Sequence, residues 1–144
     1  MVRYEHTQRA TVVVISLLAG AAFLLFLQTL VPAPRFLVLP VTGILLFCAF
    51  LFSSLTIRIT DRALCWHFGP GLIRKQVPLS EIEWAEPTRI RFVWGWGIHL
   101  TPRGWLYNVS GLGAVAVRLK GGKRFLLGTD EPARLCRALS LALS

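Results

Sequence analysis

Cys65 and His67 stand two positions apart, the spacing that places two side chains on the same face of a strand. A cysteine thiolate and a histidine imidazole are common zinc ligands, and His99 and Cys136 are the more distant residues that would complete a site. The same spacing also occurs where neither residue binds a metal, with the cysteine packed as a small apolar side chain and the histidine solvated or hydrogen-bonded. Two ligands on one strand do not make a metal site, and we expect none.

Two further patterns resemble catalytic or nucleotide-binding motifs. Residues 111–116, Gly-Leu-Gly-Ala-Val-Ala, fit a dinucleotide fingerprint, which requires a helix to begin after the glycines so that backbone amides meet a pyrophosphate. Here apolar residues alternate after Gly113, which predicts a strand. Ser80 beside Glu81, and Asp130 beside Glu131, have the positions of helix-capping residues. The sequence therefore predicts no enzyme and no cofactor.

A segment rich in tryptophan and glycine is the strongest indication of a binding site. Aromatic, basic and imidazole side chains lie close together there, with glycines beside the tryptophans that allow close approach of a backbone or ligand. Three roles fit this segment: part of the core, an aromatic contact with the membrane interface, or a groove for a protein partner. The candidate partner-binding residues are Trp94, Trp96, His99 and Arg103.

The chain is basic, with a formal net charge of +9, and most of this charge follows residue 55. Basic residues near a bilayer attract anionic lipid headgroups, and they also orient membrane proteins with the positive side in the cytoplasm. The anchor described below and the modest charge density argue against nucleic acid as the partner. The candidate lipid-facing residues are Arg58, Arg62, Arg74 and Lys75.

Two uncharged apolar stretches, Thr11 to Val31 and Phe36 to Leu55, predict the element that positions these residues. Each has about 20 residues, the length that crosses a hydrocarbon core as a helix. Positive charges precede the first stretch and follow the second, which predicts an inner-membrane protein with both termini cytoplasmic. We expect a cytoplasmic tail at residues 1–10, a two-span hairpin at residues 11–55 and one cytoplasmic domain at residues 56–144.

Small residues in the two stretches allow close packing of helices. Ser16 and Gly20 form a small-xxx-small pair, and Thr42 and Gly43 form a second point of close approach. These residues suit packing within the hairpin, a homodimer or a larger membrane complex, and the sequence leaves the three open.

The domain sequence predicts seven strands and one helix. Apolar residues alternate with polar ones, and turn residues separate the runs. The final helix would be capped by Thr129 or Asp130, with one apolar stripe that includes Leu135 and Leu139. A brief helical turn is expected from Pro78, and Gly95 to Gly104 reads as a loop or a pair of short strand pieces. The expected strands are 55–60, 63–68, 72–77, 84–94, 105–109, 114–119 and 124–127.

This order of elements, together with the phrases Gly104 to Gly111, Gly121 to Phe125 and Gly128 to Pro132, resembles bacterial pleckstrin-homology-like domain proteins with a two-helix membrane anchor. The resemblance implies a membrane-anchored α+β fold: a transmembrane hairpin, then a seven-stranded antiparallel barrel or sandwich capped by the C-terminal helix. It also implies a module that recognises lipids or peptides and catalyses nothing. The first hairpin loop, Asp61-Arg62, is too short for the usual inositol phosphate site of that family.

From these observations we expect a non-enzymatic inner-membrane protein that binds or positions a protein partner at the cytoplasmic membrane face. One alternative is a sensor of anionic lipid headgroups, and another is an accessory subunit of a membrane enzyme complex.

Overall fold

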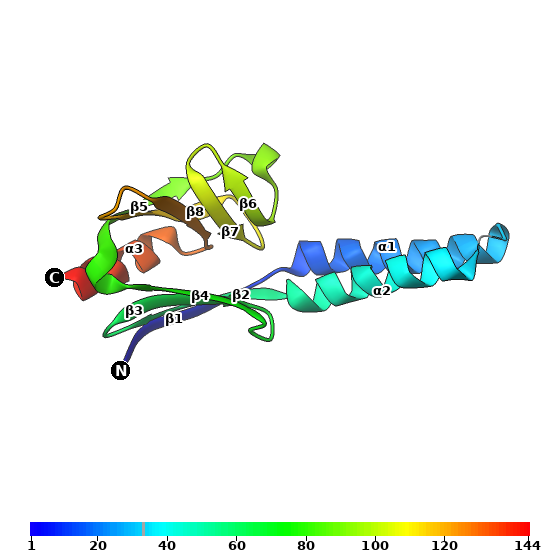
Figure 1. Ribbon diagram of the computed structural model, residues 1–144, viewed down its shortest axis with the longest axis horizontal. Helices are drawn as coiled ribbons and strands as arrows, with labels where there is room; N and C mark the ends of the chain where they lie inside the picture. Colours follow the sequence, from blue (N-terminus) through cyan, green and yellow to red (C-terminus); the bar gives the residue numbers. More distant parts are fainter. Residues whose placement is uncertain (33) are drawn as a thin grey trace.

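The computed structural model describes residues 1–32 and 34–144. It consists of a pair of helices and a domain of two sheets that continues directly from them (Figure 1). Ala33, in the turn predicted between the two apolar stretches, lies outside the described residues.

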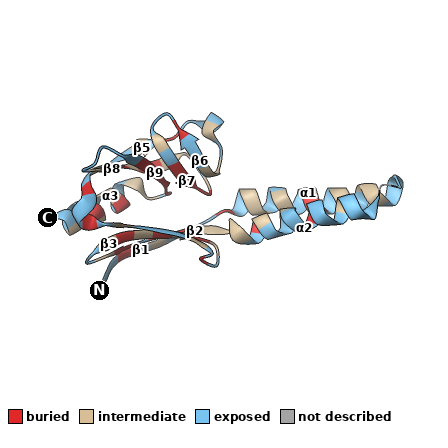
Figure 2. Cartoon of the chain, viewed as in Figure 1, coloured by how far each residue is buried: buried red, intermediate tan, exposed pale blue. Residues whose placement is uncertain are grey.

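The helix pair is apolar and has little of its surface covered. Helices α1 (Thr11–Leu30) and α2 (Arg35–Leu51) lie side by side and extend away from the domain (Figure 1). Large side chains on both helices are exposed, for example Phe23 at 58% and Phe47 at 55%, and Figure 2 shows the same along the whole pair. Exposed apolar surface of this extent is typical of a helix that contacts a membrane or a partner.

The two helices differ in length. By length and composition, α1 is the one described helix that is long and apolar enough to cross a membrane. The second predicted span is shorter than expected, because α2 has 17 residues and ends at Leu51. The chain then enters strand β2 (Ser54–Thr60), and Leu55, which the sequence assigned to the span, is 1% exposed in the domain core.

The first ten residues, expected as a tail, form a strand of the domain. Strand β1 (Val2–Arg9) pairs antiparallel with β2, with Arg9 opposite Ser54. The sequence does not predict this strand, because Tyr4 is the one strongly apolar residue among its inward positions. The inward residue Gln8 is polar and donates to the Ser110 carbonyl over 3.1 Å. The helix pair is therefore inserted between two neighbouring strands of one sheet.

The first sheet has the strand order β1-β2-β3-β4. The predicted meander is confirmed for β2, β3 (Ala63–Phe68) and β4 (Ile73–Pro78). The alternating pattern also predicted the buried face correctly, because Ile57 and Ile59 are almost fully buried while Arg58 is exposed.

The second sheet has the strand order β5-β8-β9-β7-β6 and follows a short 3-10 turn, η1 (Leu79–Glu81), where a helical turn was expected. Among the described residues, β7 and β9 pair in parallel, and all other neighbouring strands of this sheet pair antiparallel. Its strands are β5 (Ile82–Arg89), β6 (Gly97–Thr101), β7 (Gly104–Asn108), β8 (Gly113–Leu119) and β9 (Arg124–Gly128).

The long strand predicted for residues 84–94 is too long. Strand β5 ends at Arg89, and a second 3-10 turn, η2 (Phe92–Trp94), follows. Pro87 is tolerated because β5 is an edge strand, where one missing N–H does not interrupt the sheet. The described residues form nine strands where about seven were expected: β1 was not expected, and β6 lies where a loop or short strand pieces were expected.

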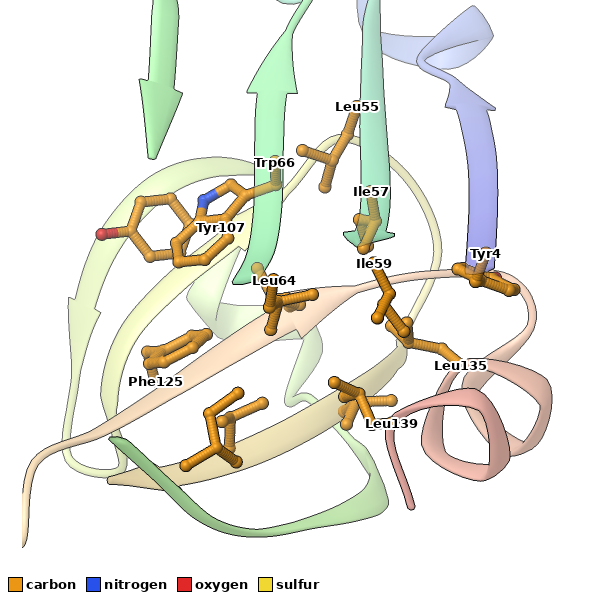
Figure 3. Close-up of a cluster of buried hydrophobic side chains, with 14 of the residues drawn as sticks. Tyr4, Leu55, Ile57, Ile59, Leu64, Trp66, Tyr107, Phe125, Leu135 and Leu139 are labelled. Carbon is orange, nitrogen blue, oxygen red and sulfur yellow. The ribbon is translucent and has the colours of Figure 1, made fainter. Parts of the chain in front are cut away.

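The core lies between the two sheets, and helix α3 (Pro132–Leu143) closes one side of it. The predicted C-terminal helix and its apolar stripe are confirmed: Leu135 and Leu139 are fully buried, and Figure 3 shows them facing Ile59 and Tyr4. Neither predicted side chain caps the helix. The Thr129 hydroxyl accepts a hydrogen bond from the Glu131 N–H in the preceding turn.

Candidate functional site

The Trp-Gly segment, residues 94–105, begins at Trp94, the last residue of η2, and runs through β6 into the start of β7. Trp94 packs against a small second core cluster that includes Ile90 and Leu106. The Arg103 guanidinium lies 5.9 Å from the centre of the Trp94 ring and donates to the Thr88 hydroxyl over 3.3 Å. Trp94 and Arg103 are thus brought together, and Trp94 has a packing role at the edge of the second sheet.

Trp96 and His99 form the second half of this segment. The Trp96 indole N–H donates to the Gly111 carbonyl over 3.3 Å, and the Trp96 carbonyl is hydrogen-bonded to the His99 ring. Gly95 and Gly97, on either side of Trp96, have φ values of +66° and +104°, a region that favours glycine. The structure therefore pairs Trp94 with Arg103 and Trp96 with His99, and the two pairs follow one another along the same segment.

This segment lies against the base of the helix pair. Trp96 and Ile98 line a hollow of about 280 Å³, and the opposite wall contains Val13 from the first turn of α1 and Phe52 just after α2. The wall is mostly apolar. The segment is consequently on the side of the domain from which the helices emerge.

Two loops at this same end expose large apolar side chains. In η2, Phe92 is 75% and Val93 is 77% exposed, and in the β3–β4 loop Leu72 is 67% exposed. In Figure 1, the yellow-green η2 and the β3–β4 loop both point toward the helix side of the domain. Gly69 fixes the second loop, because a Cβ at this position would lie 2.5 Å from the Leu51 carbonyl oxygen at the end of α2.

Of the four predicted lipid-facing residues, Arg58, Arg74 and Lys75 line one hollow of the first sheet, and Arg62 lies apart from them. Arg58 is paired with Glu5 over 2.8 Å, and this hydrogen bond raises the pKa of the guanidinium. Arg62 lies in the β2–β3 turn, at the opposite end of these strands from the helices. Arg74 lies near the β3–β4 loop and donates to the Gly71 carbonyl over 2.8 Å, whereas Lys75 points to the other side of the sheet.

A different basic set lies at the helix end of the domain. All four members are exposed, and none forms a salt bridge within residues 1–32 and 34–144. Only Arg74 belonged to the lipid-facing residues predicted from the sequence. The other three members are Arg9, at the end of β1, Arg89, at the end of β5, and Arg91, just after it. They are far apart in sequence, so only the folded structure shows that they lie at the same end of the domain.

Cys65 and His67 share the outer face of the first sheet, as their spacing predicts. With Arg58 and Arg74 they line a hollow of about 530 Å³, and the His67 Nδ1 atom is buried without a hydrogen-bond partner in the described part of the chain. The described residues contain no group of three or more His, Cys, Asp or Glu that could hold a metal ion.

Comparisons of the chain with protein-family models, with curated proteins and with solved structures find no match.

Proposed function

We propose that the protein is a non-enzymatic, membrane-anchored scaffold. Helices α1 and α2 cross the inner membrane as a hairpin, and the domain rests on the cytoplasmic leaflet and presents a binding surface to a protein partner. The observation that carries this proposal is the junction of the two parts, where the Ala10 N–H donates to the Ser53 carbonyl over 2.9 Å. No flexible linker separates a strand from a helix at either crossing.

The pairing of β1 with β2 supports a double crossing. If α1 crossed the membrane and α2 did not, these two strands would begin on opposite sides of the bilayer and could not pair. Although α2 has only 17 residues, this is the lower limit for a transmembrane helix, roughly 26 Å at about 1.5 Å per residue. Two arginines, Arg3 and Arg9, precede the hairpin, whereas Arg35 is the one basic residue between its two apolar stretches. This excess of positive charge on the domain side favours a cytoplasmic location for the domain.

The helix end of the domain has the composition of a membrane-contact surface. Phe92, Val93 and Leu72 supply exposed apolar side chains, and Trp96 has the amphipathic ring that is common at membrane interfaces. Four exposed arginines lie at the same end of the domain, none of them in a salt bridge within the described chain, and each basic residue near an anionic surface contributes about 1 kcal/mol. This combination favours docking of the domain on the anionic leaflet beside the hairpin.

Two packed sheets with a C-terminal helix over one side agree with the resemblance to bacterial pleckstrin-homology-like domains. Members of that family bind lipids or peptides. The resemblance therefore favours a binding function over catalysis.

A lipid-headgroup sensor is the second candidate, favoured by the hollow on the outer face of the first sheet. Arg74 and the unpartnered His67 ring line that hollow close to the end of α2, where a phosphate group could reach them. A sensor would respond to a soluble headgroup phosphate, whereas docking needs the bilayer itself.

The test compares two single-cysteine variants of the full chain in nanodiscs that contain anionic lipid. Val93→Cys lies in η2, and Leu141→Cys, with a wild-type exposure of 67%, is the matched control near the end of α3. With an environment-sensitive fluorophore attached, we expect a blue-shifted emission at position 93 and none at position 141. Equal emission at both positions would contradict docking, and a change at position 93 on adding inorganic phosphate alone would favour the sensor.

A further inference from the structure

The side of the sandwich away from α3 is open. There, between β4 and strands β7 and β9, lies a cleft of about 460 Å³. Its inner wall consists of Trp66, Tyr107 and Phe125, and Figure 3 shows these rings at the side of the core away from Leu135 and Leu139. Helix α3 thus closes one side of the core, and aromatic side chains line the other.

The rings are already packed against one another. Trp66 stacks on Phe125 with centroids 5.0 Å apart, and it meets Tyr107 edge-on at 5.2 Å. This packing leaves Trp66 only 3% exposed. The aromatic floor is therefore already assembled before any ligand arrives.

The floor of the cleft contains an unused hydrogen-bond donor. The indole Nε1 of Trp66 is buried and has no hydrogen-bond partner among the residues that the structure describes. Buried indole N–H groups usually find an acceptor, and an unsatisfied one costs about 1 to 3 kcal/mol. A small shift of the neighbouring rings on binding would open this N–H to a carbonyl or carboxylate oxygen of a ligand.

The rim of the cleft is basic. Lys75 comes from β4, and Lys123 and Arg124 come from the β8–β9 turn and the start of β9. All three are exposed, and within the described chain none forms a salt bridge. Trp105, 49% exposed, lies beside them. The rim therefore suits a ligand that has both acidic and apolar groups.

The cleft is bordered by an unpaired strand edge. Strand β4 is the last strand of its sheet and pairs only with β3 in the described structure. Alternate residues of such an edge direct their N–H and C=O groups outward, where an extended peptide can pair with them. The β8–β9 turn is at the end of the domain away from the helices, so this surface faces the cytoplasm rather than the bilayer (Figure 1).

We propose that the cleft binds an extended, acidic segment of a partner protein. The segment pairs with the free edge of β4 and places an apolar side chain on the aromatic floor. Its acidic residues contact Lys75, Lys123 and Arg124, and one of its oxygen atoms accepts from the Trp66 indole. The predicted partner-binding residues Trp94, Trp96, His99 and Arg103 do not line this cleft, and lipid docking is not required for it.

The test uses the full chain in nanodiscs without anionic lipid and a phage-displayed library of random linear peptides. Selection is expected to enrich peptides that alternate acidic and apolar residues. Lys75→Glu is then expected to weaken binding of the best synthetic peptide about tenfold, as measured by fluorescence anisotropy, because it replaces an attractive contact with a repulsive one. Arg137→Glu makes the same charge change on α3 and is the matched control with unchanged affinity.

Two further measurements separate binding from folding. Trp66→Phe keeps an aromatic side chain and removes the N–H, so we expect weaker peptide binding with a much smaller loss in thermal midpoint than for Trp66→Ala. Hydrogen exchange of the β4 amides should slow when the peptide is added. The inference is overturned if selection enriches the same peptides on Lys75→Glu as on the wild type. It is also overturned if β4 amides are already protected in the peptide-free protein by pairing between two copies of the chain.

Discussion

The Ala10 N–H donates a hydrogen bond to the Ser53 carbonyl over 2.9 Å, and each residue lies between a strand and one of the two apolar helices. The two helices therefore leave the domain side by side. Each strand continues into its helix within a few residues, so the end of the domain that adjoins the helices is defined by these short connections. If the hairpin spans a membrane as proposed, any docking surface at this end would lie close to the bilayer.

The topology of the hairpin predicts which positions react with impermeant thiol reagents in intact cells. In a chain whose native cysteines are replaced, we expect Ser144→Cys to be protected and Arg35→Cys, at the start of α2, to react. The reverse pattern would mean that the domain is periplasmic. Native Cys136 is a poor probe, because burial and then the Glu86 carboxylate raise the pKa of its thiol and slow its reaction in any compartment.

Gly69→Ala should destabilise the domain at its contact with α2. A side chain at this position needs an unfavourable φ of +47° and would meet the carbonyl oxygens of Leu51 and Phe50. We expect a loss of about 2 kcal/mol or more in the free energy of unfolding. The control is Gly121→Ala, where a Cβ meets no atom within 4 Å and the expected change is within about 0.5 kcal/mol. Equal thermal midpoints for the two variants would contradict the contact.

The two tryptophans Trp66 and Trp96 should respond differently to truncation. Trp66 is almost completely buried, so Trp66→Ala is expected to cost about 3 to 5 kcal/mol of stability. Trp96 is partly exposed and has one hydrogen bond from its side chain, so Trp96→Ala should cost about 1 kcal/mol. Thermal unfolding followed by near-ultraviolet circular dichroism compares them. A large loss for Trp96→Ala would show that the Trp-Gly segment belongs to the core.

Both tyrosines of the chain should ionise later than a free tyrosine. Burial, and then the nearby Glu131 carboxylate, raises the pKa of Tyr4 to about 12, and burial raises the pKa of Tyr107. Because the folded-state pKa lies above the unfolded value of about 10, the stabilisation is fully present below pH 10. It is lost as the pH rises from about 10 to about 12.

Phenolate absorbance in the near ultraviolet measures this ionisation directly. At about pH 10 the native protein should show a smaller phenolate signal than the unfolded chain. In Tyr4→Phe, the alkaline loss of stability assigned to Tyr4 should be absent. Half ionisation of both residues near pH 10 would contradict the burial of the two hydroxyls.

Regular alternation and periodicity made much of the fold predictable from the sequence. The alternating runs through Leu55 and Leu64 predicted β2 and β3, and the apolar stripe through Leu135 and Leu139 predicted α3. Strand β1 was not predictable in this way, because its inward residue Gln8 is polar and is satisfied by a hydrogen bond to Ser110. Such a partner, distant in sequence, leaves no local pattern.

The candidate site was predictable in composition and less so in placement. The residues Trp94, Trp96, His99 and Arg103 were found from the nearby glycines and aromatic residues, and the structure pairs Trp94 with Arg103 and Trp96 with His99. The basic residues were grouped by closeness in sequence, and the structure separates Arg62, in the β2–β3 turn, from Arg74, near the β3–β4 loop. The aromatic cleft could not be found, since its residues come from strands that meet only in the folded domain.

The insertion of the hairpin between β1 and β2 has a mechanical consequence. Both strands are joined to the helices at the same end of their ladder, where Arg9 lies opposite Ser54. A pull on the domain along these strands would therefore stretch the two strand–helix connections together and would not slide β1 past β2. The two connections share the load, so the helix pair should tilt or shift as one unit.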